Sequence, residues 1–165
     1  MFNGTSETTF SPDMPMTRGM FVTVLGRLHG AEVSDIDSSS FTDVAPGCYY
    51  ASYIEWAHER GIVLGIGEDM CAPDRAITRE EAALIMARYT KFAGYTPPQA
   101  NAAREYADSD KISVWAKDAV AAMQRAGIMI GVGDNEFSPK TGVTRAEIAT
   151  MFARYVKRTE AGELA

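Results

Sequence analysis

Apolar residues recur three and four positions apart in the segments that follow the Thr-Arg pairs of this chain. In the first segment they are Met20, Phe21, Val24, Leu25 and Leu28, and in the last they are Ile148, Met151, Phe152 and Tyr155. This spacing gathers apolar side chains on one face of an α-helix. The pattern predicts an amphipathic helix after each Thr-Arg pair.

The starts of two of these helices can be recognised from sequence. Thr78 is followed three residues later by Glu81, and Thr144 by Glu147. Each pair predicts a capping box, in which the two side chains satisfy free backbone N–H groups of the first helical turn. Thr17 is followed instead by Met20, so we expect a weaker cap there.

A second helix is expected before each glycine-containing loop, over residues 49–60 and 114–126. Gly61 and Gly127 stand where a glycine commonly follows a helix. Each unit therefore reads as helix, loop, helix. We expect the glycine loops to be ordered, residues 30–40 and 94–104 to be linkers, and residues 160–165 to be frayed.

A nine-residue block occurs three times, which makes this a repeat protein. It begins at Phe10, Cys71 and Phe137, and in each copy a proline and the Thr-Arg pair keep the same internal spacing. We predict the rear half of a first repeat at residues 1–30, complete repeats at 41–94 and 105–158, and one cooperative domain over 1–158. Because the first repeat lacks its front half, we expect the chain to be a piece of a longer protein, with any signal peptide outside it.

The composition limits the classes of protein to which this chain can belong. The chain has 165 residues, of which 46% are hydrophobic, and a formal net charge of −6. A core can therefore be buried, and nonspecific binding to the phosphate backbone of nucleic acids is disfavoured. No apolar run is long enough for a membrane span. Cys71 is expected to be buried where the other blocks have phenylalanine, and a Cys48–Cys71 bridge stays open.

No pattern points to catalysis, a metal or a cofactor. His29 and His58 occupy non-equivalent positions without metal-ligand spacing. Adjacent carboxylates at Glu80 and Glu81 diverge on a helix, and the Gly-x-Gly loops lack the setting of a nucleotide fingerprint. The Asp134-Asn135-Glu136 run lacks EF-hand spacing. We therefore expect a non-catalytic protein.

Several linked motifs at fixed spacing resemble the S-layer homology domain family. The second repeat carries them as Phe41-Thr-Asp43-Val, Tyr49, Gly61-Ile-Val-Leu-Gly65, Cys71-Ala-Pro73-Asp74 and Thr78-Arg79-Glu-Glu81, and the third as Tyr106-Ala-Asp108, Trp115, Gly127-Ile-Met-Ile-Gly131, Phe137-Ser-Pro139 and Thr144-Arg145-Ala-Glu147. The resemblance implies an all-α, pseudo-trimeric domain of three prongs, the first incomplete. It also implies an extracellular module that fastens a larger protein to the bacterial cell wall through a polysaccharide, often pyruvylated.

The resemblance implies roles for eleven residues. Arginine can hold the carboxylate of a pyruvate ketal through paired hydrogen bonds, and each Thr-Arg arginine begins a helix, where backbone N–H groups also favour an anion. The candidate glycan-binding residues are Arg18, Arg79 and Arg145 for the anion, Asp43 and Asp108 for sugar hydroxyls or neighbouring backbone, Tyr49 and Trp115 for a sugar ring, and Gly65, Gly67, Gly131 and Gly133 for close approach of the loop backbone.

Structural interpretations compete with these roles. The Thr-Arg arginines would then be solvated residues at capped helix starts, the aspartates caps or loop staples, and the aromatic residues core. Arg27, Arg88 and Arg154 favour contacts with C-terminal helix carbonyls. Ser6 stands in place of a loop glycine and Lys140 in place of an aspartate, so three equivalent sites are not expected.

A protein-interaction or self-assembly module at the cell surface is the alternative function. The missing half repeat is expected to leave apolar residues such as Met20, Phe21 and Val24 in need of cover. A monomer at high concentration would contradict this alternative.

Overall fold

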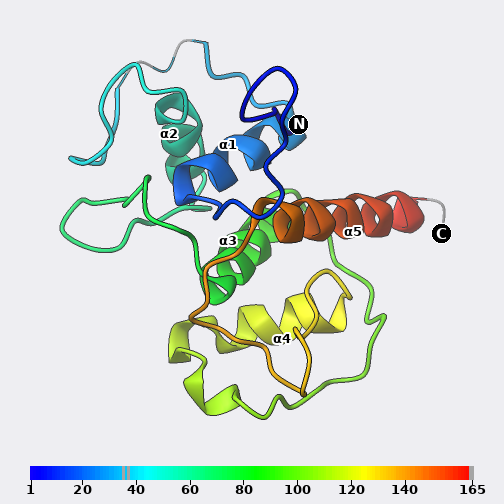
Figure 1. Ribbon diagram of the computed structural model, residues 1–165. Helices are drawn as coiled ribbons and strands as arrows, with labels where there is room; N and C mark the ends of the chain where they lie inside the picture. The colour runs from blue at the N-terminus through cyan, green and yellow to red at the C-terminus, as the bar shows by residue number, and fades with distance from the viewer. Residues whose placement is uncertain (35, 37, 164–165) are drawn as a thin grey trace. The chain divides into compact units, whose positions relative to one another are not determined.

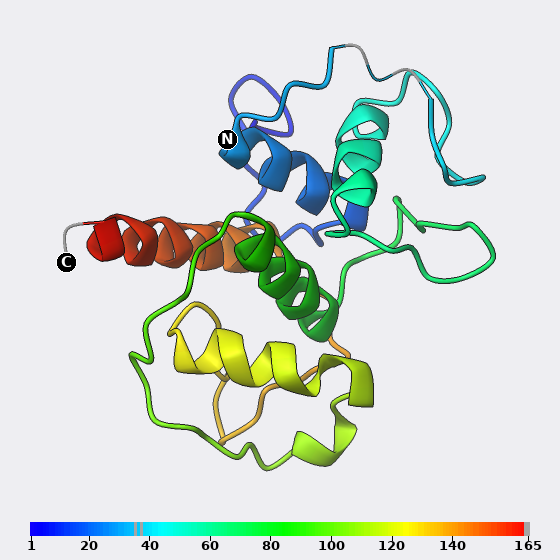
Figure 2. The ribbon, with the colours of Figure 1, turned by 180° about the vertical axis from the view of Figure 1, so that it is seen from behind.

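The computed structural model describes residues 1–34, 36 and 38–163, and the prediction of an all-α fold is confirmed across them (Figures 1 and 2). The elements are α1 (Arg18–His29), α2 (Ala51–Glu59), α3 (Arg79–Phe92), the 3-10 turns η1 (Ser109–Lys111) and η2 (Val114–Ala116), α4 (Lys117–Arg125) and α5 (Arg145–Glu163). Extended residues in this part of the chain form isolated bridges and no strand.

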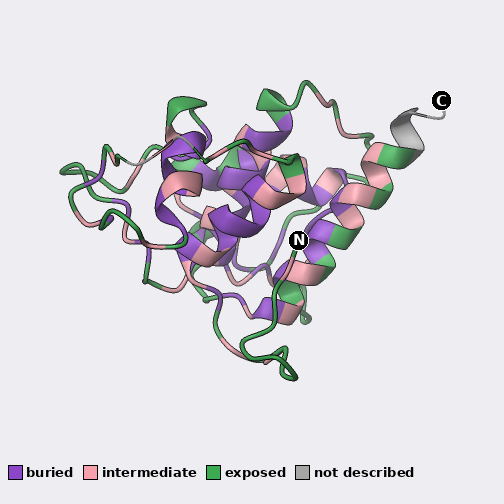
Figure 3. Cartoon of the chain, turned by 90° about the horizontal axis from the view of Figure 1, so that it is seen from above, coloured by how far each residue is buried: buried purple, intermediate pink, exposed green. Residues whose placement is uncertain are grey.

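The chain divides into two compact units, Met1–Ile77 and Thr78–Ala165. The division falls inside the predicted second repeat, so each unit combines the rear helix of one repeat with the front of the next. The repeat limits, the single cooperative domain and the three-pronged arrangement stay predictions. In both units the buried residues lie mainly on the helices and the exposed ones on the loops (Figure 3).

In the first unit α1 packs on α2, and Phe21, Leu25 and Ile54 are fully buried. The helices approach closely, because a Cβ built on Gly26 would lie 2.5 Å from the Tyr53 ring. As expected, α1 has a weaker start: Thr17 accepts from the Met20 N–H at 3.2 Å, and its first turn has no acidic residue to complete a box.

Three expectations about the first unit meet a clear outcome. Phe21 and Val24 are buried, so the expectation that they lack cover is wrong. Cys71 is buried as predicted. Cys48 and Cys71 are both free thiols, so the bridge is not formed.

In the second unit α3 packs on α4, and both predicted capping boxes are present. The Thr78 and Thr144 hydroxyls accept from the N–H groups of Glu81 and Glu147, whose carboxylates accept from the threonine N–H groups in return. The predicted fraying from residue 160 is wrong as far as the described residues reach, because α5 continues to Glu163. Residues 164 and 165 lie outside the described part.

The predicted front helices of the two complete repeats are shorter than expected. The α2 helix begins at Ala51, and the expected helix at 114–126 is divided into η2 and α4. Gly61 and Gly127 follow the helix ends with φ of 66° and 68°, as expected for left-handed residues after a helix.

Candidate functional site

The Thr-Arg arginines are buried: Arg18, Arg79 and Arg145 are 5%, 6% and 5% exposed. The Nε groups of Arg18 and Arg79 donate to the carbonyl oxygens of Cys71 and Phe137, at 2.8 and 2.7 Å. The expectation of solvated side chains is therefore wrong. Arginines at equivalent positions in the two units hold equivalent loop residues.

Backbone N–H groups at the starts of α1 and α3 also have partners within the chain. In α1 the N–H groups of Arg18 and Gly19 donate to the carbonyls of Arg75 and Pro73, and in α3 those of Arg79 and Glu80 donate to Thr141 and Pro139. These four N–H groups, which the sequence predicts as part of an anion site, are thus satisfied by the chain itself. An anion bound near Arg79 therefore does not use the N–H groups of Arg79 and Glu80.

Asp43 and Asp108 bind the backbone N–H groups of the same loops whose carbonyl groups the arginines bind. Asp43 accepts from the N–H groups of Cys71 and Ala72 at 2.8 and 2.7 Å, and Asp108 accepts from those of Phe137 and Ser138 at 2.8 Å each. Burial by itself raises the pKa of Asp108, but these backbone hydrogen bonds outweigh it and the pKa lies below its ordinary value. The loop-staple interpretation fits both residues.

The glycine loops are tight turns with matching geometry. The central residues Glu68-Asp69 and Asp134-Asn135 all have positive φ, between 45° and 58°, which is typical of a type I′ turn. Gly131 has a different reason to be glycine, because an added Cβ would lie 2.6 Å from the Glu136 carbonyl oxygen. Packing within the loop therefore accounts for Gly131 without a ligand.

The two candidate stacking residues are exposed. Tyr49 is 56% exposed and Trp115 is 53% exposed, so the core-packing interpretation is wrong for both. Tyr49 lies just before α2 in the first unit. Trp115 lies in η2, just before α4 in the second unit. The Tyr49 ring also contacts the Tyr50 ring edge-on, with 5.0 Å between the centroids, and exposed aromatic rings are a surface on which a sugar can stack.

A pocket of about 280 Å³ lies in the second unit, where residues 128–132 pass α5. Its charged lining residues are Arg79, Glu147 and Arg154, and its apolar lining residues include Ile130 and Ile148. The Arg79 Nη2 group donates to the Ile130 carbonyl at 2.7 Å, and its Nη1 group lies 3.5 Å from Glu147 Oε1. Two guanidinium groups therefore face the pocket against one carboxylate.

The environment of Arg79 is unusual for an arginine. Burial lowers the pKa of its guanidinium, an effect that the Glu147 carboxylate partly opposes. The guanidinium also lies over the Phe137 ring, with 5.0 Å between Cζ and the ring centroid. These contacts fix the orientation of Arg79 before any ligand arrives.

Arg154 was missed as a candidate. It was assigned to C-terminal helix carbonyls, but α5 extends to Glu163, so Arg154 is in mid-helix and lines the pocket. It is half-buried, and no residue in the described part of the chain hydrogen-bonds or ion-pairs with its side chain. Its recurrence ten residues after Thr144 was the available signal.

A second pocket, of about 230 Å³, adjoins the first, because Ile130 and Gly131 line both. Its other lining residues include Arg104, Gly133, Asn135 and Glu136. Of the predicted site residues, the structure thus brings Arg79, Gly131 and Gly133 together. Asp108, Trp115 and Arg145 line neither pocket, and Arg18, Asp43, Tyr49, Gly65 and Gly67 belong to the first unit.

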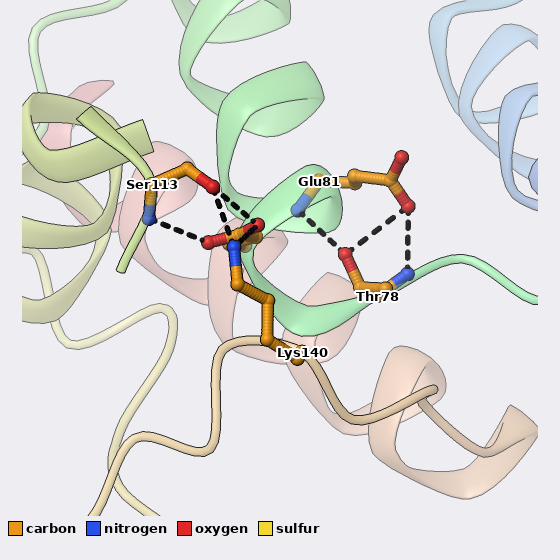
Figure 4. A network of polar contacts seen from close by, with 5 residues as sticks. Thr78, Glu81, Ser113 and Lys140 are labelled. Atoms are coloured by element: carbon orange, nitrogen blue, oxygen red, sulfur yellow. Dashed lines mark hydrogen bonds and ion pairs between the residues drawn. The ribbon is translucent and has the colours of Figure 1, made fainter. Parts of the chain in front are cut away.

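A buried carboxylate explains the unexpected Lys140. Glu80 is 3% exposed and accepts from the Ser113 N–H and hydroxyl at 2.9 and 3.0 Å and from the Lys140 ammonium (Figure 4). In the first unit the matching positions hold Gly19 and Asp74, and the Tyr50 hydroxyl donates to Asp74 at 3.3 Å. The lysine therefore accompanies the buried glutamate.

The described residues contain no group of three or more His, Cys, Asp or Glu side chains suited to a metal ion. A search of protein-family models matches residues 40–83 and 105–149 to the S-layer homology domain. The chain belongs to the S-layer homology domain family. Domains of this family are non-catalytic modules that anchor surface proteins to the cell wall.

Similar proteins include enzymes and S-layer proteins. The chain is 35% identical to an amylopullulanase of Thermoanaerobacterium thermosulfurigenes over 149 residues, which is 90% of this chain and 8% of that protein. It is 36% identical to an endoglucanase of Bacillus sp. (strain KSM-635) over 93% of this chain and 16% of that protein. It is 29% identical to the S-layer protein EA1 of Bacillus anthracis over 84% of this chain and 16% of that protein.

The S-layer homology module thus spans only a small part of each of these relatives.

Among the helices of the described residues, none is long and apolar enough to cross a membrane.

Proposed function

We propose that this S-layer homology module holds a larger protein at the bacterial cell surface by binding an acidic wall polysaccharide, and that the group it recognises is a pyruvate ketal. The observation that carries the proposal is the pocket of Arg79, Glu147 and Arg154. The module contributes binding and no chemistry of its own.

The chemistry of the pocket suits this group. A pyruvate ketal presents one carboxylate and one methyl group on the same carbon. Two guanidinium groups against one carboxylate favour the anion, and Ile130, Ile148 and Met151 provide apolar wall for the methyl group. A bare inorganic anion would use the charges but leave the apolar wall uncovered.

The two arginines have different tasks in this proposal. Arg79 has committed Nε and Nη2 to the carbonyls of Phe137 and Ile130, and its Nη1 lies 3.5 Å from Glu147 Oε1, so it contributes mainly positive charge to the ligand. Arg154 lines the same pocket without such commitments to described residues. Arg154 is therefore the principal anion contact, and Arg79 both builds the pocket and adds to its charge.

The remaining candidate residues divide into two groups. Arg18, Asp43 and Asp108 act as positioning residues, since each binds the loop backbone. Arg145 is retained as a candidate anion contact and Tyr49 and Trp115 as sugar-stacking residues, the last two supported by their exposure. Gly65 and Gly67 remain candidates for backbone contact with a glycan, by analogy with Gly131 and Gly133.

The test is calorimetric titration of the whole chain with isolated wall polysaccharide, before and after chemical removal of pyruvate. We expect binding to the pyruvylated polymer and its loss after depyruvylation. Binding that survives depyruvylation would contradict the ketal assignment, and absence of binding to both polymers would contradict the anchoring function of this chain.

Assembly through protein contacts is the second candidate function. Leu64, Ile66, Ile130 and Val132, at corresponding loop positions, are 45% to 57% exposed. Exposed apolar side chains of this kind favour protein contacts. This function requires a mass that rises with protein concentration in light scattering without glycan, and a constant monomer mass would contradict it.

A further inference from the structure

We infer that Asn3 is a site of spontaneous chemical modification, at which the side-chain amide is lost and a mixture of aspartate and isoaspartate forms. The inference does not depend on the proposed function, because it concerns the chemistry of one Asn-Gly pair in the first unit. The chain has asparagines at positions 3, 101 and 135, and only Asn3 is followed by glycine. Their surroundings indicate which of them reacts.

The reaction joins the backbone nitrogen of Gly4 to the side-chain carbonyl carbon of Asn3. The nitrogen loses its proton to a base and bonds to Cγ, the Cγ–Nδ2 bond breaks, and ammonia leaves. A five-membered succinimide ring results. Water then opens the ring, at Cγ to give aspartate or at the backbone carbonyl to give isoaspartate, without an oxidant or a reductant. Glycine favours the first step, because it has no Cβ to hinder the approach and its backbone is the most adaptable.

The reacting groups are accessible. Asn3 and Gly4 are both exposed and lie just before a short turn. In this turn the N–H groups of Thr5 and Ser6 donate to the Thr9 carbonyl, at 2.8 and 3.4 Å. No described residue accepts a hydrogen bond from the Gly4 N–H. The nitrogen that must attack is therefore open to bases in the solvent, and no hydrogen bond within the chain has to break first.

The fold requires the glycine that makes this pair labile. Gly4, Gly65 and Gly131 hold equivalent positions, and each is crowded by the carbonyl oxygen five residues later. A Cβ added to Gly4 would lie 2.8 Å from that oxygen, and one added to Gly65 or Gly131 would lie 2.6 Å from it. The residue before the glycine is leucine or isoleucine in the other two loops and asparagine only in the first. The loop geometry thus keeps Gly4, and the lability comes from the residue at position 3.

The other two asparagines are protected by hydrogen bonds. The side-chain nitrogens of Asn101 and Asn135 donate to backbone carbonyls, at 3.1 Å each. The nitrogen that would attack Asn135 belongs to Glu136, whose N–H donates to the Gly133 carbonyl at 2.7 Å. Alanine and glutamate follow these asparagines, so a Cβ also hinders the attack. The same chain therefore contains two internal controls for Asn3.

The experiment incubates the whole folded chain in mildly alkaline buffer and follows the three asparagine-containing peptides by mass spectrometry, with fragmentation that separates aspartate from isoaspartate. We expect Asn3 to lose its amide at least about tenfold faster than Asn101 or Asn135, which corresponds to about 1.4 kcal/mol in the activation barrier. Asn3→Gln, which would have to form a six-membered ring, should stay unmodified over the same period. Asn3→Leu, which copies the residue of the second loop, should give a single charge form on ion exchange.

A second incubation in urea tests the structural part of the inference. The rate at Asn3 should change little on unfolding, because the pair is already exposed, whereas the rates at Asn101 and Asn135 should rise as their hydrogen bonds are lost. If Asn3 keeps its amide in the folded chain as long as the other two asparagines do, the inference is wrong. A product that contains aspartate and no isoaspartate also overturns it, since the reaction would then bypass the succinimide ring.

Discussion

Arg79 and Asp108 hold opposite sides of one residue, Phe137. Arg79 Nε donates to the Phe137 carbonyl at 2.7 Å, and Asp108 Oδ1 accepts from the Phe137 N–H at 2.8 Å. The first unit repeats the arrangement with Arg18 and Asp43 about Cys71. Since the Phe137 side chain is fully buried, this double attachment ties the loop that ends at α5 to the core of the second unit.

Asp108→Asn should therefore destabilise the protein. The amide keeps one acceptor oxygen, so one of the two backbone N–H groups loses its partner, at a cost of about 1–3 kcal/mol. Urea unfolding followed by circular dichroism measures the change, with Asp110→Asn on the neighbouring 3-10 turn as the control. An Asp108→Asn variant as stable as the wild type would show that the staple adds nothing to stability.

The Asp108 carboxylate should also make the stability of the protein depend on pH under acidic conditions. The pKa of Asp108 is lower in the folded state than its ordinary value of 3.8, so its stabilising contribution is present above that value and lost as the pH falls through the folded pKa. Wild type should lose more stability than Asp108→Asn as the pH is lowered through this range. Parallel curves for the two proteins would contradict the assignment.

An alkaline pH dependence is expected from a tyrosine pair in the second unit. Burial and the neighbouring Tyr89 raise the pKa of Tyr155 from 10.0 to about 12, and the ring centroids of the two tyrosines lie 5.6 Å apart. A raised folded pKa gives stability that is full below pH 10 and lost as the pH rises towards 12. Tyr155→Phe should flatten that decline in thermal unfolding, whereas Tyr53→Phe in the first unit should not.

Because Glu80 is buried, the stability of the protein should depend on its partner Lys140. Lys140→Asp, which restores the acidic residue of the second repeat, should cost about 1–3 kcal/mol because Glu80 loses its counter-charge and faces a carboxylate. The double variant Glu80→Ala with Lys140→Asp should recover much of the loss in urea unfolding. If the two changes simply add, the lysine and the glutamate do not interact.

The sequence predicted the local parts of this architecture and missed the distant contacts. Capping boxes were legible because Thr78 and Glu81 are three residues apart on one helix start. The attachment of Arg79 to Phe137 joins residues 58 positions apart, and no spacing rule shows that a recurring arginine will be buried against a loop carbonyl. The spacing marked the recurring arginines, and their burial against loop carbonyls came only from the fold.

Arg154 illustrates a second limit of prediction from sequence. Its recurrence was visible, but its role depended on where α5 ends and on which segment packs beside it. Nothing local marks the end of that helix, since no glycine follows Arg154 until residue 162. Pocket residues drawn from 79, 128–132 and 143–154 meet only after folding.

Mutation of the two pocket arginines, Arg154 and Arg79, should have different effects on binding and on stability. Arg154→Ala should weaken binding to pyruvylated polysaccharide by about tenfold or more, because a charge-assisted contact is worth about 1.5–3 kcal/mol, while the free energy of unfolding changes by less than about 0.5 kcal/mol. Arg79→Ala should reduce both binding and stability, by about 2 kcal/mol for the latter, since it strips the carbonyls of Phe137 and Ile130. Arg125→Ala is the matched control: this half-buried helical arginine is in the same unit and lines neither pocket. Calorimetry and urea unfolding on all three variants decide the matter, and an Arg154→Ala variant that binds like the Arg125 control would exclude Arg154 as the anion contact.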